Sequence, residues 1–219
     1  MFVDLHMHER TFSKDSFLTL KEIVEIAKEK GLDGVCITDH DDIGIKEYAE
    51  QYSRETGFPI FVGYEFYSLQ GDILAFGAPK VPSERISAQE FVDYVKSFGG
   101  VCIAAHPFRN NNRGLEENLA TVKGLDGIEA LNGSTLPDAC SKAFSYAKRL
   151  GIQCTGASDC HVPSKVGVYA TWLPETVSTL DDFISVFKQG SAARRTRTAI
   201  VVVDSEKAIG KKKTFNRLI

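Results

Sequence analysis

Apolar runs of strand length recur along the chain and alternate with amphipathic stretches of helix length. The runs are almost continuously Val, Ile, Ala and Cys, which is typical of strands buried on both faces and indicates a mainly parallel sheet. Strands are expected at 2–8, 34–39, 59–65, 73–77, 101–106, 127–131, 153–158, 168–173 and 199–203. The alternation of strands with helices predicts either a barrel or a doubly wound sheet.

Two of the helices carry strong start signals. Thr19 precedes Glu22 and Ser87 precedes Glu90, each at the spacing of a capping box, and an apolar stripe follows both pairs. Both helices are expected to end at glycines. Further helices are expected at 45–55, 137–150 and 180–188, the last opened by Ser178 or Thr179.

All five histidines stand at the ends of apolar runs: His6, His8, His40, His106 and His161. A doubly wound sheet gathers its site at one switch point, whereas groups from strand ends along the whole chain converge only if the sheet closes. We therefore expect a small, distorted β/α barrel with a metal site at its C-terminal mouth.

The spacing of these residues favours metal ligation. His6 and His8 are two apart on a strand, so both imidazoles point to one face and can bind one ion. Asp159 and His161 repeat this spacing. Glu65 ends an apolar run, where a buried carboxylate is costly unless it is paired with cations, and bridging two ions would remove that cost.

Neighbouring residues suggest supporting roles. One of Asp39 and Asp41 could orient the imidazole of His40. His106 precedes a proline, which predicts an extended conformation that aims its side chain into the mouth. Arg109 follows closely and either clamps an anionic oxygen through forked hydrogen bonds or is a surface arginine.

The donor set narrows the chemistry. The sequence has no Gly-x-Ser-x-Gly elbow, Gly-x-Gly-x-x-Gly motif or Walker lysine loop. Several histidines with carboxylates suit zinc, manganese or iron better than calcium. Two such ions ~3.5 to 4 Å apart would bridge a hydroxide as nucleophile for phosphoryl transfer.

Length, charge and composition limit the kind of protein that could hold such a site. The 219 residues with 43% hydrophobic content suffice for one compact domain. A net charge of −3 argues against stable nucleic-acid binding, and neither a signal segment nor a membrane-spanning run is visible, so we expect a cytoplasmic protein with no membrane partner. The five cysteines are expected to be buried and reduced. No pattern specifies an oligomeric state.

Two regions are expected. Residues 1–193 form the metal-binding barrel, and residues 194–219, richer in Lys and Arg, form a final strand and basic tail packed against it.

Five short motifs in this order resemble those of the PHP (polymerase and histidinol phosphatase) domain superfamily: 4–8, 37–41, 63–65, 105–107 and 158–161. The resemblance extends to about Thr171, most of the chain. It implies a distorted TIM-like (β/α)7 barrel that holds two or three divalent ions and hydrolyses phosphoesters.

The resemblance also implies a ligand set. One ion would be held by His6, His8, Glu65 and Asp159, and a second by His40, His161 and Asp15 from the loop after the first strand. A third would use Glu65, His106 and another histidine on the following strand. That strand has no histidine here, so Asp72 would have to serve as an oxygen ligand or the third site would be weak.

Arg109 matches an arginine that often follows the His-Pro motif in stand-alone members, which favours the phosphate-clamp interpretation. Arg109, Asp159 and His161 are the expected catalytic residues. The sequence therefore predicts a stand-alone metal-dependent phosphoesterase acting on a small phosphorylated metabolite or nucleotide, with histidinol phosphate less favoured. The alternatives are an amidohydrolase-type metallohydrolase and a non-catalytic metal-binding PHP scaffold.

Overall fold

The computed structural model describes residues 1–173, 177–192 and 200–202. They form an α/β fold in which strands and helices alternate, as expected. In chain order the elements are β1 (Phe2–Asp4), α1 (Leu20–Glu29), β2 (Gly34–Ile37), α2 (Lys46–Thr56), β3 (Ile60–Val62), β4 (Tyr64–Tyr67), β5 (Asp72–Phe76), α3 (Ala88–Ser97), β6 (Val101–Ala104), η1 (Glu116–Ala120), β7 (Gly127–Asn132), α4 (Pro137–Leu150), β8 (Gln153–Ala157), η2 (Pro163–Lys165), β9 (Tyr169–Trp172), α5 (Leu180–Ala192) and β10 (Ile200–Val202).

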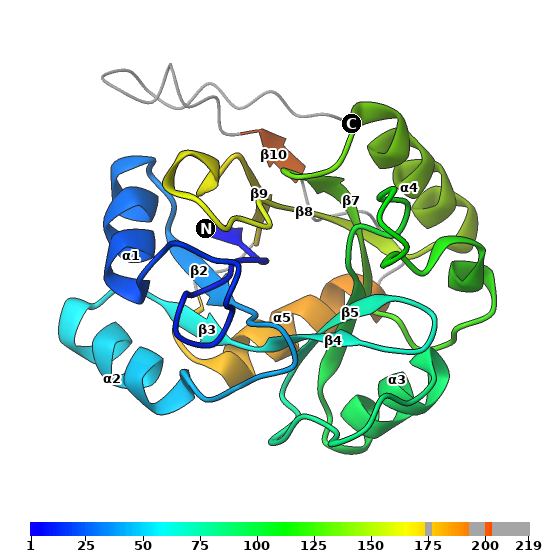
Figure 1. Ribbon diagram of the computed structural model, residues 1–219, viewed down its shortest axis with the longest axis horizontal. Coiled ribbons are helices and arrows are strands. Elements are labelled where there is room, and N and C mark those ends of the chain that lie inside the picture. Colours follow the sequence, from blue (N-terminus) through cyan, green and yellow to red (C-terminus); the bar gives the residue numbers. More distant parts are fainter. Residues whose placement is uncertain (174–176, 193–199, 203–219) are drawn as a thin grey trace.

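The described strands form two five-stranded sheets, in the orders β10-β9-β1-β2-β3 and β4-β5-β6-β7-β8. Figure 1 shows the first sheet beside α1 and α2 and the second beside α3 and α4. Four strand pairs are parallel and four are antiparallel, so the prediction of a mainly parallel sheet is wrong. A short turn joins β4 to β5, and a connection this short permits only antiparallel pairing.

The expected single strand at 59–65 is two strands, β3 and β4, on different sheets. Gly63 separates them because the backbone passes unusually close to β5 at this point. A Cβ atom on Gly63 would lie 2.4 Å from the carbonyl oxygen of Ala75. The glycine therefore allows the chain to leave one sheet and enter the other.

The two sheets meet through isolated bridges and do not close into one continuous ladder among the described residues. His40 bridges to Glu65, and Met7 bridges to Cys160, both in parallel orientation. The α/β prediction is confirmed, while the closed barrel is not seen in the hydrogen-bond pattern. Both bridges involve or adjoin the expected ligands, so the junction of the sheets brings these residues together.

The helices begin where the sequence predicts. Thr19 and Ser87 each accept a hydrogen bond from the backbone of the glutamate three residues later, and each glutamate bonds back to the cap. The Thr179 hydroxyl accepts a hydrogen bond from the Asp182 amide, so Thr179 opens α5. No described helix has both the length and the apolar character needed to cross a membrane.

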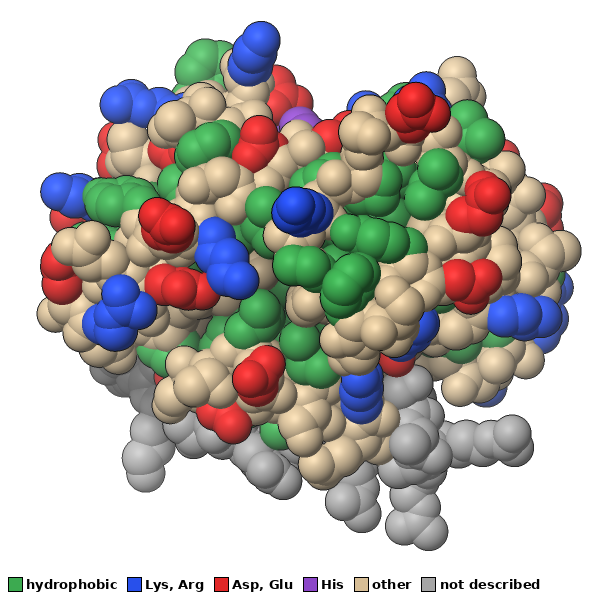
Figure 2. All heavy atoms as spheres, turned by 90° about the horizontal axis from the view of Figure 1, so that it is seen from below, with side chains coloured by type: hydrophobic (Ala, Val, Ile, Leu, Met, Phe, Trp, Pro, Cys, Tyr) green, Lys and Arg blue, Asp and Glu red, His purple; other side chains and the backbone are tan. Residues whose placement is uncertain are grey.

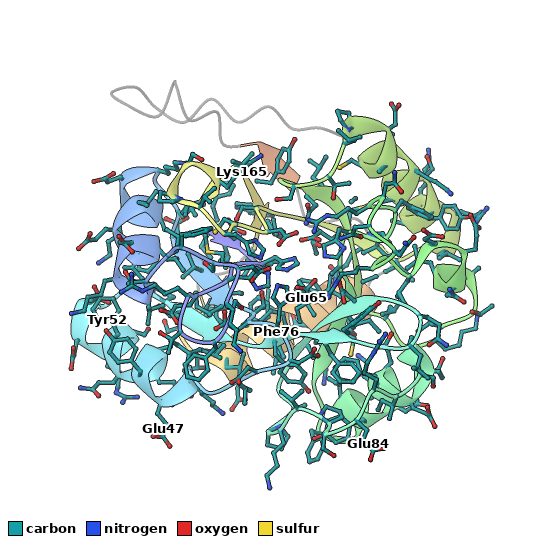
Figure 3. The ribbon with its side chains drawn as sticks, viewed as in Figure 1. Glu47, Tyr52, Glu65, Phe76, Glu84 and Lys165 are labelled. Carbon is teal, nitrogen blue, oxygen red and sulfur yellow. The ribbon has the colours of Figure 1, made fainter. Side chains whose placement is uncertain are left out.

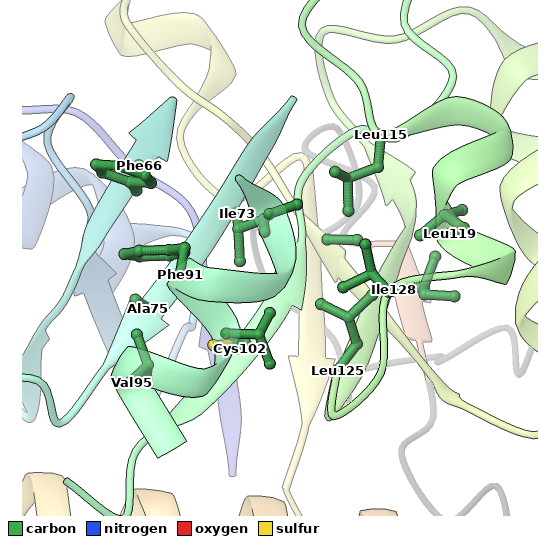
Figure 4. Packing of buried hydrophobic residues seen from close by; sticks show 14 of the residues in the cluster. Phe66, Ile73, Ala75, Phe91, Val95, Cys102, Leu115, Leu119, Leu125 and Ile128 are labelled. Atoms are coloured by element: carbon green, nitrogen blue, oxygen red, sulfur yellow. The ribbon is translucent and has the colours of Figure 1, made fainter. Parts of the chain in front are cut away.

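Aromatic side chains anchor the second sheet to α3. The rings of Phe66 on β4 and Phe91 on α3 stack with centroids 4.1 Å apart (Figure 4). Burying a phenylalanine side chain stabilises a fold by about 1.5–3 kcal/mol, and both side chains are almost fully buried. This packing holds β4, which carries Glu65, in a fixed position.

The predicted final strand and basic tail lie largely outside the described residues. Within them, β10 pairs antiparallel with β9. All five cysteines are buried free thiols, as predicted.

Candidate metal centre

The segment after β1 lies between two other segments that carry site residues. The Thr38 amide donates to the Met7 carbonyl at 2.8 Å, and the Asp159 amide donates to the His6 carbonyl at 2.8 Å. These bonds extend β1 past its last regular residue and align it with the ends of β2 and β8. The side chains of His6 and His8 consequently project from one backbone segment toward a common point.

Four side-chain donor atoms meet at that point. The Nε2 atoms of His6 and His8 are 3.0 Å apart, and each lies 3.4 Å from Oε2 of Glu65. Oδ1 of Asp159 lies 3.6 Å from Nε2 of His6 and 3.3 Å from Nε2 of His8. All four residues are buried, and Figure 3 labels Glu65 near the middle of the molecule. This is the first ligand group.

Hydrogen bonds on the far side of each ring fix the tautomers. His6 Nδ1 lies 3.1 Å from Glu129 Oε1, which can only accept a hydrogen bond when ionised. His8 Nδ1 lies 3.2 Å from the hydroxyl of Ser13, which itself donates to Asp39 at 2.7 Å. Each Nδ1 atom therefore carries a proton and each Nε2 atom is turned toward the carboxylates, which is the arrangement in which imidazoles bind a metal ion.

A second ligand group adjoins the first. His40 and His161 each place Nε2 at 3.3 Å from Oδ2 of Asp15. Nδ1 of His40 lies 2.9 Å from Oε2 of Glu65, the same oxygen that faces the first group. The same oxygen thus faces both groups, so Glu65 is placed between two candidate cation sites.

A third group of ligand-type side chains comprises Glu65, Asp72 and His106. Nε2 of His106 lies 2.8 Å from Oε1 of Glu65 and 3.7 Å from Oδ2 of Asp72. Asp72 also forms a two-pronged ion pair with Arg113, at 2.7 and 3.0 Å. In this group a guanidinium engages both carboxylate oxygens of Asp72, whereas Arg109 contacts Oδ2 of Asp159 and leaves Oδ1 facing the histidines of the first group.

Two site residues have unusual backbone conformations. His106 has φ of 25° and Asp159 has φ of 49°, both in the left-handed region that non-glycine residues seldom adopt. The extended conformation predicted for His106 is therefore wrong. Its amide donates to Glu129 Oε2 at 2.7 Å, a bond that helps to hold this strained conformation.

Charges in the cluster are strongly interdependent. Burial opposes the charge of His6, yet Asp159, Glu129 and Glu65 outweigh it and raise its pKa well above the usual range. Burial lowers the pKa of His8 to about 3. Burial alone would raise the pKa of the Glu65 and Asp159 carboxyls. The charge of His6 and the contacts with neighbouring histidines outweigh burial and lower both pKa values. The centre thus combines ionised carboxylates with a neutral imidazole, which is a suitable donor set for a divalent cation.

Arg109 lies at the edge of the first ligand group. Its guanidinium contacts Asp159 and donates to Oδ1 of Asn132 at 2.8 Å. The side chain is 19% exposed, so it lies between the buried ligands and solvent. Arg109 therefore belongs to the candidate site and is not a free surface arginine.

The expected role of Asp39 and Asp41 in orienting His40 is wrong. Asp39 accepts from Ser13 and from the Glu9 amide, while Asp41 accepts from the Tyr67 amide at 2.9 Å. Both carboxylates satisfy backbone groups of the loops, and the His40 ring faces Glu65 instead.

Sequence reasoning missed Glu129, Asn132, Ser13 and Arg113. Glu129 had a visible signal, because it is a charged residue inside an otherwise apolar strand. Ser13 and Arg113 lie in polar loops, where nothing local distinguishes them. Their roles depend on contacts across the fold.

The centre opens to solvent on one face. Figure 2 shows a notch on the upper edge of the molecule with a histidine side chain at its floor and acidic side chains beside it. The His40 and His161 side chains are 29% and 24% exposed, whereas those of His6 and His8 are fully buried. The second ligand group is therefore the one that solvent reaches.

Comparisons with solved structures show proteins of the same fold. Among solved structures, a candidate metal-dependent phosphoesterase of Bifidobacterium adolescentis matches with a TM-score of 0.65 and 22% identity, over 88% of this chain and 96% of that one. An amidohydrolase of Chromobacterium violaceum, solved with bound sulfate and no metal, matches with a TM-score of 0.64 and 20% identity, over 94% and 99%. A lesion-specific endonuclease of Pyrococcus furiosus matches with a TM-score of 0.62 and 18% identity, over 86% and 56%.

Sequence comparisons identify the family. An uncharacterized protein of Methanocaldococcus jannaschii, MJ1587, is 28% identical over 141 residues, covering 60% of this chain and 82% of that protein. The PHP-associated family model matches residues 137–192, and the PHP domain model matches residues 4–136, more than half of the chain. The five motifs and the convergent histidines thus have a common explanation: this chain belongs to the PHP domain family.

Proposed function

We propose that this protein is a metal-dependent phosphoesterase that hydrolyses a small phosphorylated metabolite or nucleotide. The observation that carries the proposal is the convergence of the Nε2 atoms of His6 and His8, 3.0 Å apart, with the carboxylates of Glu65 and Asp159, all buried at the junction of the two sheets. Because the Nδ1 atom of each of these rings is held by another side chain, the Nε2 atoms are the ones available to a cation.

The geometry supports two ion sites. His6, His8, Glu65 and Asp159 would hold the first ion, and His40, His161 and Asp15 the second, with Glu65 between them. Imidazole with carboxylate ligands suits zinc, manganese or iron. When bound, such ions activate water for attack on phosphorus and stabilise the charge of the phosphoryl oxygens.

The remaining residues prepare the site. Glu129 and Ser13 hold the first two imidazoles in the metal-binding tautomer. Arg109 stands beside Asp159 at the solvent side, where its guanidinium can bind an anionic oxygen of the substrate. The notch in Figure 2 gives a small substrate access to these groups.

One observation favours a second candidate, hydrolysis of amides or rings, because a structural relative is described as an amidohydrolase. That protein shares 20% identity with this chain, which supports a common fold. The two candidates make different demands on the substrate, so direct assays separate them.

The test is phosphate release from p-nitrophenyl phosphate and from a panel of nucleotides and sugar phosphates, with added Mn²⁺. Wild-type protein should hydrolyse members of this panel and leave amides and lactones intact. His6→Ala and Asp159→Ala should each lose more than about 100-fold in activity, because they remove ligands and not only groups that orient them. Glu47→Gln, on the exposed surface of α2 (Figure 3), is the matched control and should retain activity.

Circular dichroism should show that the variants remain folded, because ligands at strand ends contribute to the site more than to the core. Hydrolysis of amides or lactones but of no phosphoester would establish the second candidate. Metal binding without any turnover would instead indicate a non-catalytic scaffold.

A further inference from the structure

The third ligand-type group, Glu65, Asp72 and His106, is arranged differently from the first two. We propose that no third ion binds there and that the guanidinium of Arg113 takes the place of a third cation, so that the protein holds two ions. This inference rests on the proposed metal centre and specifies its composition.

Arg113 is held at this position by several independent contacts. Its Nε and Nη2 atoms lie 2.7 and 3.0 Å from the two oxygens of Asp72. The Arg113 carbonyl accepts a 2.6 Å hydrogen bond from the Asp72 amide. The guanidinium also lies over the ring of Tyr67, 4.2 Å from its centroid. Side chain and backbone thus fix the charge against Asp72.

The pairing occupies both oxygens of a carboxylate that is 1% exposed. A divalent ion between Asp72, Glu65 and His106 would lie close to the guanidinium, and the two positive charges would repel each other. The ion would therefore have to displace Arg113 from a bidentate pair of the kind that is strongest in proteins.

The hydrogen bonds of His106 point to the same conclusion. His6 and His8 each have an acceptor at Nδ1, so a metal can bind their Nε2 atoms while Nδ1 keeps a hydrogen-bonded proton. His106 Nδ1 is buried and has no hydrogen-bond partner among the described residues, while its Nε2 lies 2.8 Å from Glu65 Oε1.

The favoured tautomer therefore carries its proton on Nε2 and donates it to Glu65. Metal binding at Nε2 would move that proton to Nδ1 and bury an N–H group without an acceptor, which is costly. The second-sphere support present at the first ion site is missing here.

Metal content tests the proposal directly. Protein reconstituted with Mn²⁺ and desalted would be analysed by inductively coupled plasma mass spectrometry, with calorimetric titration as a second count. Wild-type protein should bind two ions. Asp72→His combined with Arg113→Ala removes the competing cation and supplies an imidazole, and should bind three.

Arg85→Met is the matched control. Arg85 faces the ring of Tyr67 at 3.6 Å, as Arg113 does, but its hydrogen bonds go to the carbonyls of Tyr67 and Ser68. This variant should still bind two ions. Arg113→Lys keeps the positive charge and should also bind two ions. This result would show that the number of bound ions depends on the charge at position 113 and not on the shape of the side chain.

The outcomes separate the inference from the proposed function. Three ions in the wild-type protein would overturn the role of Arg113 and leave the phosphoesterase proposal standing. A double variant that is folded by circular dichroism but still binds two ions would also overturn it. No bound metal in wild-type protein, even after reconstitution, would overturn both.

Discussion

Oε1 of Glu129 lies 3.1 Å from Nδ1 of His6, although 123 residues separate them in the chain. The other oxygen of Glu129 accepts from the His106 amide at 2.7 Å and from the side-chain amide of Asn132 at 2.9 Å. One buried carboxylate on β7 therefore holds the proton on Nδ1 of His6, a proposed metal ligand, and also holds the backbone of His106.

Glu129→Gln should lower metal affinity by roughly 10–100-fold, the usual effect of losing a partner that orients a ligand. The amide removes the negative charge that favours a proton on His6 Nδ1, while its size is nearly unchanged. Titration of apo-protein with Mn²⁺ or Zn²⁺ measures the effect, with Glu47→Gln as control. Equal affinities in the variant and the wild type would show that Glu129 does not support the site.

The sequence predicted which side chains converge at the candidate metal centre because their signals are local. Two histidines two apart after an apolar run, and an aspartate and histidine with the same spacing, can be recognised without the fold. Glu129 and Arg113 act through contacts between segments far apart in the chain. Their partners, His6 and Asp72, become evident only once the two sheets are placed in space.

The fold was predictable to a similar extent. Capping boxes at Thr19 and Ser87 gave the starts of two helices because the reciprocal hydrogen bonds are confined to one turn. The division of the strands between two sheets was not predictable in this way. It depends on Gly63, where a side chain would collide with the carbonyl oxygen of Ala75 on another strand. The strain at His106 likewise comes from partners across the site.

Asp15→Asn should remove the second ion and leave the first. Asp15 is the carboxylate that faces both His40 and His161, and a neutral amide is a weaker ligand for a divalent ion. Metal analysis should fall from two ions to one, and hydrolysis should fall with it. Retention of two tightly bound ions would exclude Asp15 from the ligand set.

Arg109→Ala should mainly weaken substrate binding, with KM rising about 10-fold, equivalent to roughly 1.4 kcal/mol. The guanidinium stands at the solvent side of Asp159 and can bind a phosphoryl oxygen there. Arg109→Lys should recover only part of the affinity, since lysine cannot form the forked pair. Steady-state kinetics with p-nitrophenyl phosphate provide the measurement. An unchanged KM would show that Arg109 does not bind the phosphoryl group.

Chelation should destabilise the protein, because removing the ions leaves the buried carboxylates of the cluster without the cations that compensate their charge. Free metal at 100 times its dissociation constant stabilises a folded state by about 2.7 kcal/mol. For a chain of this size the melting temperature should rise by roughly 5–10 °C when metal is restored to the apo-protein. Thermal unfolding monitored by circular dichroism, with and without Mn²⁺ after dialysis against a chelator, measures the shift. Asp159→Ala should show a much smaller shift, because the first ion loses a ligand. An equal shift in this variant would mean that the stabilising ions bind elsewhere.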